Sequence, residues 1–309
     1  MKKYKLLVLI LVISNIILAV LYWRHTSGRH LENTYENPYP LIDVSRNFIP
    51  QEDFVVNLQP LRETLTPIYE EYGKDKISLY IEFLNTGANI SYNPDARYYP
   101  ASLIKMPAAM AAAKKVEKGE WGWDSELVLF AGDVEERFGN LYKESIGARF
   151  SIEKLMEEML VNSDNTAHLM LLRNVGVGEV TDYLVSAGLE DLFDSDSNIT
   201  AKEYTRIFRS LYTSSYLSRE YSEKVLNWLS KVPDNIYLDK GLPDDIAFAH
   251  KYGENVKEFI YADSGIVYIP NRPYIITVLY KGDGSESEKS ANDFFEKVSK
   301  AAYDHFKKN

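Results

Sequence analysis

The stretch that decides the fold is Tyr98-Tyr-Pro-Ala-Ser-Leu-Ile-Lys-Met-Pro107, which leads into an alanine-rich segment that ends near Gly119. Ser102 and Lys105 stand three residues apart at the start of a predicted buried helix. Side chains at i and i+3 share one helix face, with Cβ atoms about 5–6 Å apart, so the amine can reach the hydroxyl. A serine needs a neighbouring base to become a nucleophile, and an apolar setting lowers the pKa of a lysine enough for it to serve.

Ser-x-x-Lys taken alone is a weak signal, because a chain this rich in serine and lysine contains about one copy by chance. A second copy does occur, at Ser151-Ile-Glu-Lys154. Ser151 has the character of an ordinary helix N-cap, so we place no chemistry there. Other parts of the chain must decide whether Ser102 is a nucleophile.

Composition excludes several classes of function. The 309 residues are 45% hydrophobic, which is enough for a large core, and the net charge of −10 with no basic patch argues against nucleic-acid binding. The absence of cysteine excludes disulfides, a thiol nucleophile and Cys-ligated zinc. The five histidines show no paired helical spacing, so we expect neither a metal nor an organic cofactor; they are His25, His30, His168, His250 and His305.

The N-terminus predicts a membrane attachment. Leu6 to Trp23 is an almost unbroken apolar run of about the length that crosses a bilayer as a helix. It ends in aromatic residues and Arg24 rather than in small residues, which favours an uncleaved anchor in residues 1–24 over a cleaved signal peptide. Residues 25–50 form a polar tether, and we expect a folded domain of residues 51–309 on the extracytoplasmic side of the cell membrane, or secreted if the segment is cleaved.

The remaining pattern predicts an α+β fold of the α/β-α kind. Alternation over 77–84 and 88–92 indicates a hairpin, and four later stretches are predicted strands: 247–252, 259–261, 265–269 and 274–280. Helical periodicity marks 58–72, 152–160, 165–173, 180–187, 202–212, 221–232 and 288–306. We therefore expect one antiparallel sheet completed by both chain ends, in a subdomain of residues 51–100 and 245–309, with an inserted helical subdomain of residues 101–244.

Two further motifs carry possible chemistry. Ser163-Asp-Asn165 lies between two predicted helices, where it is either a capping sequence or a loop that presents a hydroxyl and an amide to a cleft. Lys251-Tyr-Gly253 lies in a predicted strand, where glycine indicates a close backbone approach and a lysine is costly to bury. Taken alone, each of these two motifs is explained by a structural role and does not require a chemical one.

Together, the three motifs resemble a known family. Ser102-x-x-Lys105, Ser163-Asp-Asn165 and Lys251-x-Gly253, in this order, are similar to the signatures of class A β-lactamases and penicillin-binding proteins. The resemblance extends from about Leu58 to Phe306, and it implies an active-site serine hydrolase that acts on a β-lactam or a related peptidoglycan peptide.

The resemblance also assigns roles to residues. Ser102 would be acylated with Lys105 as the proton acceptor, and Ser163 would relay the proton to the departing nitrogen. Lys251 would face the substrate carboxylate and hold down the pKa of Lys105, and Asn165 would bind the side-chain amide of the substrate.

Strand residues complete the implied site. Gly253 and Tyr252 would border the substrate, and the backbone N–H groups of Ser102 and Glu254 would form the oxyanion hole. Asp164 is expected to be a structural cap rather than a catalyst.

Two positions depart from the family pattern. The Glu-x-x-Leu-Asn motif that supplies the deacylating base is missing, and the segment between Gly188 and Thr200 is short. Its acids are the remaining candidates: Glu190, Asp191, Asp194 and Asp196. The second departure is Tyr252, a bulky phenol where the family has a small hydroxyl, which affects substrate selection.

Three functions therefore stand beside one another. A β-lactamase with a different deacylating group follows from the family resemblance. A penicillin-binding D-alanyl-D-alanine peptidase with slow deacylation follows from the missing glutamate, because a positioned base contributes about 10²–10⁴ in rate. The third is a non-catalytic anchored binding domain of the same fold. A binding domain does not need all four of the polar residues that the chain retains, which are Ser102, Lys105, Ser163 and Lys251. We expect a monomer in each case.

Overall fold

The computed structural model describes residues 14–16, 18, 39–42, 56–233, 235–284 and 286–308. The predicted anchor Leu6–Trp23 and the predicted tether 25–50 lie outside these residues, apart from the short described pieces. Within the described part of the chain, no helix is both long enough and apolar enough to span a bilayer.

A five-stranded antiparallel sheet forms the centre of the fold. Its strands are β1 (Ile77–Phe83), β2 (Asn89–Tyr92), β7 (Phe248–Asn255), β8 (Ile260–Val267) and β9 (Tyr274–Lys281). They are ordered β2-β1-β9-β8-β7, so the early hairpin joins the late strands through the β1–β9 pair. The predicted antiparallel sheet built from both chain ends is confirmed.

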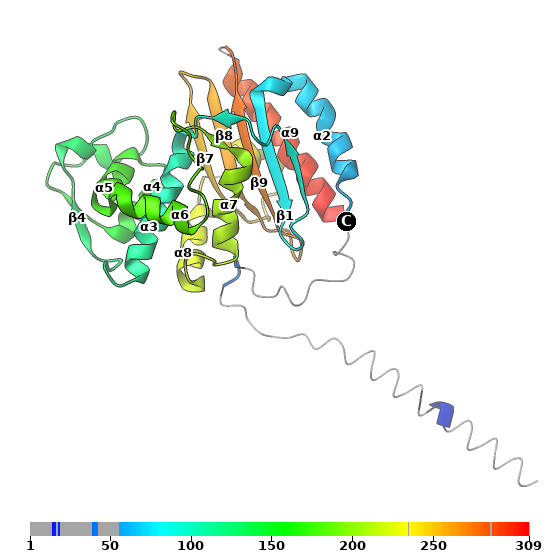
Figure 1. The fold of residues 1–309 in the computed structure, drawn as a ribbon, viewed down its shortest axis with the longest axis horizontal. Coiled ribbons are helices and arrows are strands. Elements are labelled where there is room, and N and C mark those ends of the chain that lie inside the picture. Colours follow the sequence, from blue (N-terminus) through cyan, green and yellow to red (C-terminus); the bar gives the residue numbers. More distant parts are fainter. Residues whose placement is uncertain are drawn as a thin grey trace, which may run out of the picture. The chain divides into compact units, whose positions relative to one another are not determined.

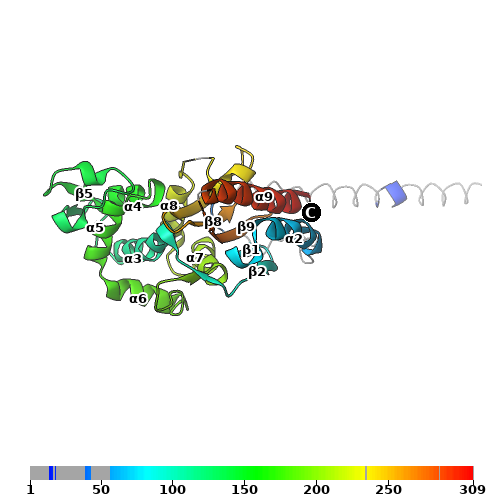
Figure 2. The ribbon, with the colours of Figure 1, turned by 90° about the horizontal axis from the view of Figure 1, so that it is seen from above.

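Two terminal helices cover one face of this sheet. Helix α2 (Gln59–Tyr72) lies beside α9 (Ser287–Lys308), and Figures 1 and 2 show both on the same side of the strands. α9 buries an apolar stripe that includes Phe294, Phe295 and Phe306. Because successive strand residues face opposite sides, β1 is buried along its whole length only if the second face is covered too.

The second face is covered by helices from the middle of the chain. Helix α7 (Ala201–Tyr212) packs against β1, β8 and β9, and its neighbours extend the helical part away from the sheet, as Figure 1 shows. These neighbours are α3 (Lys105–Glu117), α4 (Ile152–Val161), α5 (Asn165–Val175), α6 (Val177–Ser186) and α8 (Arg219–Leu229). The remaining elements are β3 (Arg97–Tyr98), β4 (Glu126–Val128), β5 (Arg149–Ser151), β6 (Ile199–Thr200) and the 3₁₀ turns η3 (Lys74–Lys76), η4 (Ala101–Ile104), η5 (Ala131–Asp133), η6 (Leu141–Lys143) and η7 (Tyr237–Gly241).

The structure differs from the sequence prediction in two places near the site. The predicted strands 259–261 and 265–269 are one strand, β8, because the polar residues between them have partners: Asp263 accepts from Leu238 N, and Ser264 bonds Thr277. Ser102 lies in η4, a 3₁₀ turn that precedes α3, rather than in the α-helix itself.

Candidate active site

The turn that carries Ser102 is held from both sides. Ala101 adopts a φ of 49°, and the N–H of Leu103 donates to the carbonyl of Pro100 at 3.0 Å. The Tyr204 hydroxyl from α7 donates to the Leu103 carbonyl at 2.9 Å. A residue in the left-handed region persists only where its surroundings determine it, so these contacts fix the direction of the Ser102 side chain.

Lys105 connects the two predicted hydroxyls. Its Nζ lies 3.0 Å from Ser102 Oγ and 3.0 Å from Ser163 Oγ, and it donates to the Ser163 carbonyl at 2.5 Å. The side chain is 1% exposed. Burial, together with the positive charge of Lys251, lowers the pKa of Lys105 to about 6. At neutral pH the amine is therefore mostly unprotonated, with a lone pair for the Ser102 proton.

Ser163 reaches Lys105 because of the strained turn between α4 and α5. Its φ is 53°, and the following residue, Asp164, caps α5 by accepting from Ala167 N at 2.8 Å. The same carboxylate accepts the N–H groups of Asn140 and Leu141, at 2.7 and 2.9 Å. The prediction that Asp164 is a structural cap is confirmed.

Lys251 and Gly253 share the face of β7 that meets η4. β7 is an edge strand of the sheet. Alternate residues of a strand share a face, and Ala249 packs in the helical core, so Lys251 and Gly253 also face the helical part of the protein. A Cβ built on Gly253 would lie 2.5 Å from the backbone nitrogen of Ser102, so only glycine allows this approach. Lys251 is fully buried, and desolvation lowers its pKa to about 7. The negative charge of Asp263 acts in the opposite direction and raises this pKa.

Tyr252 and Glu254 face the α9 side of the sheet. The Tyr237 hydroxyl of η7 donates to Glu254 Oε2 at 2.5 Å, and the Tyr237 and Tyr252 rings are 5.7 Å apart. The Tyr252 ring also lies 5.1 Å from Lys251 Nζ. The phenol that replaces the family hydroxyl is therefore held next to the lysine by an aromatic neighbour.

Glu135 is a residue of this site that the sequence did not predict. Its carboxylate accepts from Asn165 Nδ2 at 3.0 Å and from Arg137 Nε at 2.6 Å. The bond to Arg137 lowers the pKa of Glu135. Nothing in the irregular segment 129–148 signals this contact, which joins residues 30 positions apart.

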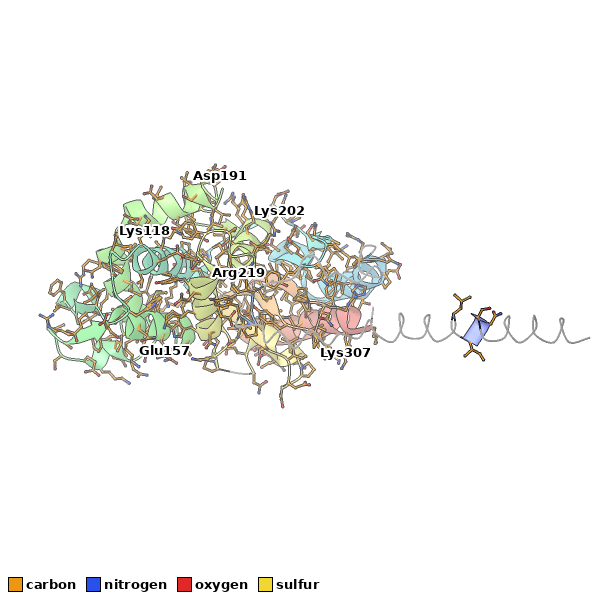
Figure 3. The ribbon with its side chains drawn as sticks, turned by 90° about the horizontal axis from the view of Figure 1, so that it is seen from below. Lys118, Glu157, Asp191, Lys202, Arg219 and Lys307 are labelled. Carbon is orange, nitrogen blue, oxygen red and sulfur yellow. The ribbon has the colours of Figure 1, made fainter. Side chains whose placement is uncertain are left out.

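The acids of the short segment 188–198 have other surroundings. Arg97 donates to the carbonyls of Leu192 and Asn198, both at 3.2 Å, which ties the segment to β3. Asp194 accepts the N–H groups of its own turn, and Asp191 projects from the surface in Figure 3. Glu190 and Asp196 are exposed. None of the contacts found for these four carboxylates involves Ser102 or Lys105, within the described residues.

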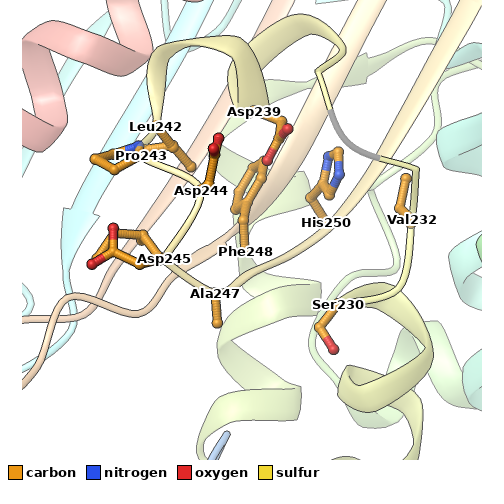
Figure 4. A pocket seen from close by; sticks show the side chains of 11 residues that line it. Ser230, Val232, Asp239, Leu242, Pro243, Asp244, Asp245, Ala247, Phe248 and His250 are labelled. Carbon is orange, nitrogen blue, oxygen red and sulfur yellow. The ribbon is translucent and has the colours of Figure 1, made fainter.

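A separate pocket of about 320 Å³ lies under the connection between η7 and β7 (Figure 4), and none of the eight predicted site residues lines it. His250 lines it, with its Nδ1 2.9 Å from a carboxylate oxygen of Asp263. Among the residues that the structure describes, no group of three or more potential ligands could hold a metal ion.

Several curated proteins with similar sequences are beta-lactamases. Extended-spectrum beta-lactamase PER-1 of Pseudomonas aeruginosa is 23% identical over 235 residues, which are 68% of this chain and 76% of that protein. A beta-lactamase of Streptomyces fradiae is 25% identical over 221 residues, 62% of this chain and 68% of that protein.

Solved structures share the fold. The structure of PBP-A superposes with a TM-score of 0.72 at 21% identity, covering 80% of this chain and 97% of that one. A beta-lactamase of Sphaerobacter thermophilus DSM 20745 also gives 0.72 at 21% identity, covering 81% and 98%. The profile of the beta-lactamase enzyme family matches residues 60–306, which is most of the chain and contains every residue of the site built above. The protein is thus a member of the beta-lactamase enzyme family.

Proposed function

We propose that the chain is an active-site serine hydrolase that forms an acyl-enzyme at Ser102 with a β-lactam and then hydrolyses it. The observation that carries this proposal is the position of the Lys105 amine, 3.0 Å from both Ser102 Oγ and Ser163 Oγ, with its pKa lowered to about 6. A binding domain has no need of an unprotonated buried amine between two hydroxyls.

The chemistry follows from these contacts. The neutral amine of Lys105 takes the proton of Ser102, whose Oγ attacks the lactam carbonyl. The oxyanion would be stabilised by the N–H groups of Ser102 and Glu254, each of which contributes about 3–4 kcal/mol in comparable sites. Ser163 passes the proton to the departing nitrogen, and Lys251 pairs with the substrate carboxylate.

A second function, that of a D-alanyl-D-alanine peptidase with slow deacylation, is favoured by one observation. The carboxylates of segment 188–198 are exposed or bonded within their own turn, and none of the contacts found for them reaches Ser102 or Lys105 within the described residues. One solved relative, a PBP-A mutant, is known as an acyl-enzyme complex with penicillin G. Both functions use the same acylation step and differ in how fast water then releases the acyl group.

Intact-protein mass spectrometry over time tests the proposal. The soluble domain from about residue 51 is mixed with a penicillin, with Ser102→Ala as the control. A mass gain that decays while hydrolysed penicillin accumulates is the result expected of a β-lactamase, and a gain that persists indicates the peptidase. No gain at all contradicts both and leaves a binding domain.

We also propose that the domain works on the extracytoplasmic side of the cell membrane, held by Leu6–Trp23. The support is the sequence alone: an apolar run of bilayer length with lysines before it and aromatic residues at its end. Fractionation of cells that express the full chain tests this, because a protein washed out of membranes by high salt or alkali has no spanning helix.

A further inference from the structure

The pocket under the connection between η7 and β7 has no part in the chemistry above. Its volume of about 320 Å³ is enough for a small organic molecule. His250 lines it, and the side chain of this histidine is only 2% exposed. Because a buried polar side chain normally has its hydrogen-bonding atoms satisfied, the state of His250 indicates what this pocket can hold.

The imidazole of His250 is fixed in orientation and has one nitrogen unused. Its Nδ1 donates to Asp263 Oδ1 at 2.9 Å, and its ring stacks on Phe248 with centroids 4.2 Å apart, as Figure 4 shows. A carboxylate at Nδ1 places the proton of the neutral ring there, so Nε2 is a hydrogen-bond acceptor. Nε2 has no hydrogen-bond partner among the residues that the structure describes. It is available to a donor in the pocket.

The charged side chains of the pocket are acidic. Asp239, Asp244 and Asp245 line it, and no lysine or arginine does so in the described part of the chain. Asp239 accepts the N–H of Asn235, and the charge of Asp245 acts on Lys307 of α9. Asp244 is exposed and has no ionic or hydrogen-bond partner within the described residues. The resulting negative potential favours a cation.

The remaining lining suits an organic cation better than a metal ion. Among the residues that the structure describes, no group of three or more potential ligands could hold a metal. Much of the wall is apolar and can contact an alkyl chain; its side chains are Val232, Leu242, Pro243, Ile246 and Phe248. A protonated primary alkylamine combines an apolar chain, a positive charge and N–H donors.

We propose that this pocket binds a small alkylammonium ion, which donates a hydrogen bond to His250 Nε2. The carboxylates of Asp239, Asp244 and Asp245 neutralise its charge, and the apolar wall covers its chain. Occupation of this site is independent of the proposed hydrolysis, because it involves no covalent step and none of the residues that line the pocket belongs to the acylation site.

Ligand-observed NMR titrations of the full chain test the site, with pentylamine as the probe. Pentan-1-ol has the same alkyl chain without the charge, and pentanoate has the opposite charge. We expect saturable binding of pentylamine with a Kd of about 1 mM, a value reasonable for six heavy atoms, and binding of pentan-1-ol that is weaker by about tenfold or more. Pentanoate is expected not to bind, and added salt is expected to weaken the binding of pentylamine.

Two variants locate the site. His250→Asn keeps a donor near the Nδ1 position for Asp263 and removes the acceptor that lies in the pocket, so we expect about tenfold weaker binding of pentylamine. Asp244→Asn removes one exposed charge, and about two- to fivefold weaker binding is expected. The matched control is Asp196→Asn, an exposed position that does not line the pocket, which is expected to bind as wild type does. Thermal unfolding shows whether each variant is folded.

Equal affinities for pentylamine and pentan-1-ol overturn the proposal, because apolar contact alone then explains the binding. The same holds if pentylamine shows no saturable binding up to about 10 mM, or if folded His250→Asn binds it as tightly as wild type. Asp244→Asn keeps the test decisive if His250→Asn does not fold, and an equal loss in Asp244→Asn and Asp196→Asn contradicts the site. A wild-type protein that binds pentylamine as expected but forms no penicillin adduct supports this site and contradicts only the function proposed for Ser102.

Discussion

Gly253→Ala perturbs the contact between β7 and the Ser102 turn without removing any reactive group. The added Cβ would stand 2.5 Å from Ser102 N and 3.1 Å from both Ala101 Cβ and the Pro100 carbonyl oxygen. Ordinary contact begins at 3.4 Å, so the two backbones must separate by about 0.9 Å. Two of these neighbours are backbone atoms, which cannot rotate away as a flexible side chain would.

The expected effect follows from that displacement. A misplacement of about 1 Å costs roughly 10²-fold in rate, which is about 2.7 kcal/mol of transition-state stabilisation. Overpacking costs a further 1–3 kcal/mol or so of unfolding free energy, about 2–12 °C in Tm for a domain of this size. The assay is the acylation rate constant with penicillin by quenched mass spectrometry, beside a thermal unfolding curve that shows the variant is folded.

Gly178→Ala is the matched control. A Cβ there meets nothing within 4 Å, and the residue lies within α6, so we expect unchanged acylation and about 0.5–1 kcal/mol of added stability. A folded Gly253→Ala protein that acylates at the wild-type rate would refute the close approach as a determinant of the oxyanion site.

Three further outcomes are expected. The acylation rate falls about tenfold per pH unit below pH 6, because Lys105 is then protonated, and it also falls above pH 7, because Lys251 loses its charge. Lys251→Met removes a neighbouring cation and so raises the pKa of Lys105, which moves the acid limb to higher pH. A pH profile of the acylation rate for both proteins checks these expectations. Asp164→Ala removes the acceptor of three backbone N–H groups and is expected to cost roughly 3 kcal/mol in urea unfolding, whereas a loss below 1 kcal/mol contradicts the capping role. Arg97→Ala frees segment 188–198 and is expected to bring new protease cuts there with acylation unchanged within about twofold, so a large loss of acylation would mean that the segment contributes to the site.

The local geometry of Ser102, Lys105 and Ser163 could be predicted from the sequence, because each of the two motifs is fixed by local structure. Ser102 and Lys105 are one turn apart, and Ser163 stands next to a capping Asp164, so short-range rules place them correctly. Their mutual approach needed the family resemblance, since the Lys105–Ser163 contact joins residues 58 positions apart.

The contacts that escaped prediction depend on tertiary partners. Asp263 resembles a strand breaker in sequence, yet it lies inside β8 because His250 and Leu238 N satisfy its carboxylate. Glu135 lies in an irregular segment without periodicity, and only the packing of that segment on α5 brings it to Asn165. No pattern of spacing along the chain carries such information.

The two buried lysines explain why the site needs more than its reactive residues. Lys105 and Lys251 are both desolvated, and burial lowers the pKa of each. Asp263, which is not a reactive group, raises the pKa of Lys251, while the charge of Lys251 lowers that of Lys105. Both effects favour a proton on Lys251, where a substrate carboxylate needs it, and disfavour one on Lys105, which must accept the proton of Ser102. Asp263, which is held in the sheet by hydrogen bonds to His250 and Leu238, thus favours the charged form of Lys251 and, through it, the role of Lys105 as the base.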